Sequence, residues 1–145
     1  MSEYDERFTS NQVMQVMELE NDYQAERDFI TLIAWQKARE VRLFFYKNII
    51  SRLPKEEKYS LDIQIRKASV SSTANIAEGY GRYYYQEGIQ FYRISIGSLY
   101  ELKDHLISCF DLGYIDQDTV YKGQNLIETA KITLNGYINY IKHKK

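Results

Sequence analysis

Apolar residues recur at intervals of three and four along four segments of this chain, which is the spacing of one helix face. The spacing predicts helices over about residues 34–53, 61–81, 86–112 and 118–142. Pro54 follows the first segment, and the residue before a proline disfavours helical backbone. Gly113 follows the third segment and suits a left-handed C-terminal cap. Four helices of this length with short connections predict an all-α, up-down-up-down four-helix bundle.

Small residues dominate one face of the second predicted helix, where Ser69 and Ser72 recur at helical spacing. Small side chains let a neighbouring helix approach closely, so we expect this face to pack against the third helix. Gly97 lies within that third helix, where it costs about 1 kcal/mol relative to alanine, and close packing there would offset the cost. We expect Gly79 or Gly81 to end the second helix in a left-handed cap.

Polar residues also mark where two of the helices begin. Ser60 precedes the second predicted helix, and its hydroxyl is expected to accept a bond from a free amide of the first turn. Asp116 or Asp118 is expected to cap the fourth helix in the same way.

Charge divides the chain into two parts. The whole chain carries −1, and residues 1–29 hold eight acidic and two basic side chains, which leaves +5 for residues 30–145. We therefore predict an acidic extension over residues 1–29, mobile or weakly docked, and a bundle domain over residues 30–145. Acidic runs are usually solvated. The alternative is that the extension folds over a basic face and competes with an anionic partner.

Composition indicates a cytoplasmic protein. No apolar stretch approaches the roughly 20 residues of a membrane span, and the N-terminal residues lack the basic and apolar regions of a signal peptide. A single cysteine forms no internal disulfide, which fits a reducing compartment.

Candidate catalytic chemistry is sparse. His105 and His143 have no neighbouring ligands at a metal-binding spacing. His105 and Cys109 are an i, i+4 pair that could bring a thiolate near an imidazole, but Cys109 falls on the apolar stripe, where a buried hydrophobe is the simpler interpretation. We expect no catalytic residue, metal or cofactor, and hence no enzyme.

A polar cluster closes the second predicted helix. Glu78 and Arg82 are spaced to form an ion pair, with Asn75 and Gly79 beside them. A catalytic carboxylate with an anion-binding arginine is one interpretation. A structural corner, or a subunit contact, is the one that we favour, because no second acid or nucleophile completes a site.

Tyrosines follow this corner. Aromatic rings next to cations can stack single-stranded bases. The tyrosines beside Arg82 and Arg93 that could do so are Tyr80, Tyr83, Tyr84, Tyr85 and Tyr92. Tyrosine suits protein interfaces equally well, and an interface is favoured. Candidate contacts to a nucleic acid or another partner are therefore Arg66, Lys67, Tyr83, Tyr84, Tyr85 and Arg93.

Several motifs occur together in order along residues 30–145. They are Trp35-Gln-Lys-Ala38, Tyr46, Leu53-Pro54, Gln64-Ile-Arg-Lys-Ala68, Asn75-Ile-Ala-Glu-Gly79 within Ser71 to Arg82, Gly97-Ser-Leu-Tyr-Glu-Leu102, and Leu112-Gly-Tyr-Ile115. With these motifs the chain resembles the four-helix bundle proteins encoded by intervening sequences in bacterial 23S ribosomal RNA. The same family includes the accessory variability determinants of diversity-generating retroelements.

The resemblance implies a left-handed bundle that assembles with itself as a homopentamer. In the retroelement branch it implies a strongly basic barrel that binds nucleic acid and a reverse transcriptase. This chain is nearly neutral, and affinity for phosphates depends on lysine and arginine. We therefore expect a non-enzymatic, homo-oligomeric scaffold for a protein or ribonucleoprotein partner. The alternative is a retroelement accessory protein that binds RNA and a reverse transcriptase.

Overall fold

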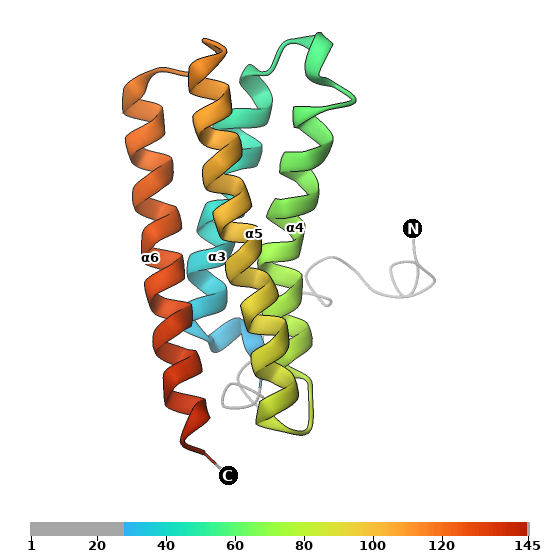
Figure 1. Ribbon diagram of the computed structural model, residues 1–145, viewed down its shortest axis with the longest axis vertical. Coiled ribbons are helices and arrows are strands. Elements are labelled where there is room, and N and C mark those ends of the chain that lie inside the picture. The colour runs from blue at the N-terminus through green and yellow to red at the C-terminus, as the bar shows by residue number, and fades with distance from the viewer. Residues whose placement is uncertain (1–27, 145) are drawn as a thin grey trace, which may run out of the picture.

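The computed structural model describes residues 28–144, which form four long helical segments and no strand. The segments lie side by side along the long axis of the molecule (Figure 1). The first is composite, with α3 (Ile33–Phe44) continued by the π-helical η2 (Phe45–Ile49) and the 3-10 helix η3 (Ile50–Arg52). The others are α4 (Leu61–Tyr80), α5 (Tyr85–Asp111) and α6 (Gln117–Lys142). Short 3-10 helices, η1 (Phe29–Thr31) and η4 (Lys55–Glu57), complete the described chain.

Each long segment packs against two others. α4 and α5 are in contact, as are α5 and α6, and α3 contacts both α4 and α6. The expected all-α bundle is thus confirmed, and its helix bounds agree with the predicted ones to within about a residue at most ends. Almost all of the predicted acidic extension, including its suggested contact with a basic face, lies outside the described residues.

The hydrophobic core consists of two clusters. One is centred on Phe45, Leu102 and Ile127, in the half of the bundle that contains the α5–α6 connection. The other contains Ile76 and Tyr92 and lies toward the connection between α4 and α5. Each cluster draws residues from all four segments, as a bundle core does when its helices bury one stripe each.

The seam between α4 and α5 is built from small polar residues, as expected. Ser69 and Ser72 are fully buried. The hydroxyl of Ser95 on α5 donates to the main-chain oxygen of Ser72 at 2.5 Å, and that of Ser98 donates to the hydroxyl of Ser71 at 2.7 Å. Hydrogen bonds between helices therefore accompany the close approach.

Gly97 was expected to pack against this face of α4, and that prediction was wrong. A β-carbon built on Gly97 meets no atom of the described residues within 4 Å, so Gly97 faces outward. Gly88 makes the close approach instead. A β-carbon on Gly88 would lie 2.8 Å from the main-chain oxygen of Gly79. Helical phase explains the difference, because the neighbouring Ser95 and Ser98 face α4 and turn Gly97 away from it.

The expected cap at the end of α4 was also wrong. Gly79 is still helical, and Gly81 has an ordinary φ of −76°. Among the described residues, positive φ occurs at Gly113 alone, at 80°. There the amide of Tyr114 donates to the Cys109 oxygen at 2.9 Å and that of Gly113 to the Phe110 oxygen at 3.0 Å. This is the Schellman pattern, and it confirms the predicted role of Gly113.

The two N-caps differ in their chemistry. Asp116 caps α6, because one of its carboxylate oxygens accepts from the Thr119 amide at 2.8 Å. Ser60 occupies the N-cap position of α4, yet its hydroxyl makes no cap bond and donates to Glu57 Oε1 at 2.5 Å. The expected mechanism at Ser60 was therefore wrong, although its position was correct.

A π-helical turn interrupts the first segment, where a continuous α-helix was expected. Buried residues there step by four from Val41 to Phe45 to Ile49. Each step of four turns about 40° past a full turn of an α-helix. The wider π turn absorbs this drift and keeps all three side chains, together with Ile50, inside the bundle.

Candidate functional site

Six tyrosines converge at the end of the bundle where α4 leads into α5 and where α6 ends. They line a cavity of about 400 Å³, which we call the tyrosine pocket. Its lining is Gly79, Tyr80, Arg82, Tyr83, Tyr85, Gly88, Tyr92, Tyr137, Tyr140, Ile141 and Lys144. The lower end of the bundle in Figure 1 contains both the α4–α5 connection and the end of α6.

Two glycines form the base of the pocket. A β-carbon on Gly79 would lie 2.7 Å from Tyr92 Cε1 and 2.8 Å from the Gly88 oxygen. No side chain fits at either glycine, so α4 and α5 meet backbone to backbone. This contact fixes the corner from which Arg82, Tyr83 and Tyr85 project.

The inner wall consists of one buried phenol, Tyr92, and one partly buried phenol, Tyr137. Tyr92 is 2% exposed, and its ring meets that of Tyr137 edge to face with centroids 5.4 Å apart. Burial raises the pKa of the Tyr92 phenol strongly, and nearby Tyr137 adds to this effect. Burial also raises the pKa of Tyr137. Both phenols are therefore neutral at physiological pH and offer hydrogen bonds without charge.

The outer wall is exposed and cationic. Tyr83 is 89% exposed and touches the Tyr84 ring edge to face at 4.8 Å. The ammonium of Lys144 lies 4.6 Å from the centre of the Tyr140 ring. The guanidinium of Arg82 lies 4.5 Å from the Phe91 ring centre. Two cation–π contacts therefore lie at this end of the bundle.

A second cavity of about 600 Å³ adjoins the first. Its lining is Tyr83, Tyr84, Tyr85, Gln86, Lys142 and Lys144, so the two cavities share Tyr83, Tyr85 and Lys144. Among the described residues, no carboxylate lines either cavity. This end of the bundle therefore offers aromatic surface and positive charge together.

The structure brings together only part of the predicted polar cluster. Glu78 pairs with Arg82 at 2.5 Å, and Gly79 and Arg82 both line the tyrosine pocket. Asn75 is used locally, because its amide donates to the Ser71 main-chain oxygen at 2.9 Å. Both contacts join residues four apart in the chain, along α4 and the residues that follow it.

The three basic residues predicted to contact a partner, Arg66, Lys67 and Arg93, do not line either cavity. Arg66 pairs with Asp62 and covers the Tyr46 ring at 5.3 Å. Both Arg66 and Lys67 are exposed in the first half of α4, about three turns or more from Tyr83. Arg93 is exposed on α5 and lines neither cavity.

The residues that the end of the fourth helix contributes to this site were not predicted from sequence. They are Tyr137, Tyr140, Ile141, Lys142 and Lys144. Basic residues at a helix end suit the helix dipole, and Tyr137 falls on the apolar stripe of its helix, so neither pattern connects these residues to the corner. The signal that links them to the corner is topological, because the expected up-down order returns the end of the fourth helix to the turn between the second and third.

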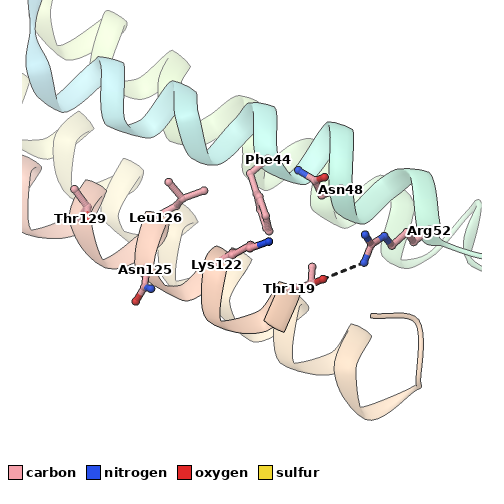
Figure 2. Close-up of a pocket in the computed structure, with 8 residues that line it drawn as sticks. All are labelled: Phe44, Asn48, Arg52, Thr119, Lys122, Asn125, Leu126 and Thr129. Atoms are coloured by element: carbon pink, nitrogen blue, oxygen red, sulfur yellow. Dashed lines mark hydrogen bonds between the residues drawn. The ribbon is translucent and has the colours of Figure 1, made fainter. Parts of the chain in front are cut away.

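A groove of about 500 Å³ lies farther along the bundle, between α6 and the π-helical part of the first segment. Figure 2 shows Phe44 and Leu126 pointing into it and Arg52 reaching across to Thr119, whose hydroxyl accepts at 3.0 Å. Lys122 pairs with Asp118 at 3.1 Å. The groove is thus apolar at its base, and this lysine is matched by a carboxylate.

The histidine–cysteine hypothesis is not supported by the contacts. His105 Nε2 lies 3.2 Å from Glu101 Oε2. Cys109 is fully buried, and burial raises the pKa of its thiol to about 11. The thiol is therefore protonated at neutral pH and packs as a small apolar group, as expected. Within residues 28–144 no three potential metal ligands lie together.

None of the helices over residues 28–144 has both the length and the apolar character that a bilayer crossing requires.

Comparison with known proteins gives one clear relationship. A search of curated proteins found no match to this sequence. The family model of the 23S rRNA-intervening sequence protein matches residues 31–136, which is most of the chain and nearly all of the helical bundle. The match begins within η1 and ends in the last third of α6. The chain therefore belongs to the 23S rRNA-intervening sequence protein family.

Proposed function

We propose that this protein is a non-enzymatic, homo-oligomeric scaffold of the cytoplasm that docks a protein or ribonucleoprotein partner. Its protomer is a left-handed, up-down-up-down bundle, and five copies assemble into a ring, as the family resemblance implies. The short connections between the helices and the contact of α3 with both α4 and α6 support this topology. The observation that carries the assembly is a pair of outward-facing glycines.

No contact within the described part of one chain requires a glycine at position 97 on α5 or at position 136 on α6. A β-carbon built on either meets no atom of the described residues within 4 Å. A mid-helix glycine costs about 1 kcal/mol relative to alanine. Gly79, Gly88 and Gly123 differ, since each meets a neighbouring helix or side chain at under 3 Å.

Large apolar side chains lie beside both outward glycines. Ile94 and Tyr100 flank Gly97, and Ile132 lies one turn before Gly136, each of these side chains more than half exposed. A glycine between apolar neighbours lets a second helix approach closely while the flanking side chains are buried. Such a face suits a contact between copies of the chain, where small residues and exposed apolar groups gather.

The charge distribution favours the scaffold over the retroelement-type accessory protein. Several cations of the bundle are paired, as in Arg66 with Asp62 and Lys122 with Asp118. A strongly basic barrel needs free lysine and arginine on its faces. The accessory role with a reverse transcriptase therefore ranks second.

The molar mass in solution tests this proposal. Five copies of the 17.2 kDa chain give about 86 kDa by light scattering coupled to size-exclusion chromatography. Gly97→Gln and Gly136→Gln add a helix-compatible side chain where one protomer has space for it. We expect both to yield smaller species with unchanged helical circular dichroism, whereas Gly81→Gln, which lies on neither α5 nor α6, is expected to retain the full mass.

Two results would overturn the proposal. One is a wild-type protein that stays at 17.2 kDa at all concentrations and salt levels. The other is retention of the full mass by both glutamine variants, which would show that the outward glycines do not lie between copies.

A further inference from the structure

We propose that the tyrosine pocket and the cavity beside it bind single-stranded nucleic acid, with bases stacked on tyrosine rings and phosphates held by Lys142, Lys144 and Arg82. This inference goes beyond the scaffold role. It does not rest on assembly, because every residue that it uses belongs to one chain.

The aromatic content of the pocket exceeds what packing requires. Six of the chain's 14 tyrosines line this one cavity. Tyr92 and Tyr137 complete the core, yet Tyr83 and Tyr140 are largely exposed at the opening. Exposed rings are available as stacking platforms, and stacking accepts any base because each base has a π face.

The charged side chains that line the two cavities are all positive, so they favour an anionic ligand. Lys144, Lys142 and Arg82 are the charged side chains of the two linings, and no described carboxylate is among them. Of these three, Arg82 alone pairs with a carboxylate of residues 28–144, that of the exposed Glu78. The ammonium of Lys144 lies 4.6 Å from the Tyr140 ring centre, so a ring and a cation are adjacent. A nucleotide presents a base and a phosphate side by side in the same way.

The volumes indicate a strand in preference to a free nucleotide. Both cavities, about 400 and 600 Å³, fall within the range of about 300–1,000 Å³ that ligand sites occupy. They adjoin through Tyr83, Tyr85 and Lys144. Two successive nucleotides can therefore occupy them with a shared phosphate near Lys144. The groove in Figure 2 lacks this combination, because its lysine pairs with Asp118.

The test uses fluorescence anisotropy of a fluorescein-labelled RNA hexamer with the full chain at 50 and 200 mM salt. Tyr83→Leu is expected to weaken binding about tenfold or more, the usual size of a lost stacking contact, and Tyr83→Phe is expected to retain it. Lys144→Gln is expected to weaken binding and to reduce the salt dependence by the equivalent of one phosphate contact.

Tyr59→Leu is the matched control. Tyr59 is exposed and has Lys58 beside its ring, but it lies just before α4 begins, far from the pocket. It should bind as the wild type does. Duplex RNA and polyglutamate should compete poorly, because neither offers unpaired bases.

The proposal is overturned if the wild type does not bind the hexamer at 50 mM salt, or if Tyr83→Leu and Tyr59→Leu behave alike. Equal competition by duplex or polyglutamate would also overturn it, since that result indicates an unspecific basic surface. Each of these results leaves the molar mass unchanged, so they are distinguishable from a failure of assembly.

Discussion

Gly79 and Gly88 meet backbone against backbone, such that a β-carbon on either would lie 2.8 Å from the main-chain oxygen of the other. At this contact the backbones of α4 and α5 leave no space for a side chain between them. The contact also leaves room for the Tyr92 ring, which would meet a β-carbon on Gly79 at 2.7 Å. The stability of the corner and the shape of the tyrosine pocket therefore depend on the same two residues.

We predict that Gly79→Ala and Gly88→Ala each lower the free energy of unfolding by about 1–3 kcal/mol, the usual cost of overpacking. Urea unfolding followed by circular dichroism measures this. Gly81→Ala is the control, because its β-carbon would make ordinary contacts at 3.6 Å and its φ is −76°. Equal tolerance of alanine at Gly79 and Gly81 would contradict the close contact.

Alanine at position 69, in contrast, is expected to stabilise the protein. The hydroxyl of Ser69 is buried and has no hydrogen-bond partner within the described chain. Because a buried unpaired hydroxyl is costly, Ser69→Ala should stabilise the protein by about 1 kcal/mol. Ser95→Ala loses the bond to the Ser72 oxygen and should destabilise it by about 1 kcal/mol. Thermal unfolding of both variants checks the prediction, and a loss of stability in Ser69→Ala would refute it.

The buried thiol of Cys109 should make the free energy of unfolding depend on pH. Burial raises the pKa of its thiol from about 9 to about 11. Below pH 9 the thiol is protonated in both states and contributes no pH dependence. Between pH 9 and 11 the unfolded chain loses this proton and the folded chain retains it, so stability falls by about 1.4 kcal/mol per pH unit. Cys109→Ala should flatten this part of the curve in urea titrations at pH 8 to 10.5.

The carboxylate of Asp116 should make stability depend on pH in the acid range. Here stability falls as the pH falls, whereas for Cys109 it falls as the pH rises. Its hydrogen bonds from Thr119 hold the pKa of its carboxyl below the usual value. Its contribution is therefore complete above the unfolded-state pKa and is lost as the pH falls through the lower folded-state pKa. Asp116→Asn keeps a capping oxygen and should lower the urea midpoint less than Asp116→Ala. Equal midpoints at pH 7 would show that the cap contributes nothing.

The sequence predicted the helices well because their boundaries depend on local chemistry. Pro54, Asp116 and Gly113 act on the residues next to them, and apolar spacing reports which face each helix buries. The role of each glycine was harder to predict. Gly79, Gly88 and Gly97 differ in which helix they face, and that depends on helical phase and on neighbouring segments, which composition does not reveal.

The candidate site was predicted only at one corner. Gly79, Arg82, Tyr83 and Tyr85 are close in sequence and lie together in the structure. Lys144 and the tyrosines of α6 join them from some 50 residues away, so their part in the site depends on tertiary packing. Arg66 was selected for its charge alone, and it is already engaged by Asp62 and Tyr46.

The π turn at Phe45–Ile49 has a consequence for how this chain tolerates insertions and deletions. A π turn holds one residue more than an α turn, so it shifts the angular phase of everything before it relative to everything after it. Deleting Lys47, which lies in this turn, should convert it to α-helix. The buried Ala34, Ala38 and Val41 would then rotate by about 100° relative to Ile49 and Ile50. The first segment thus contains one extra residue in its π turn, and both of its halves bury their apolar side chains only because that residue is present.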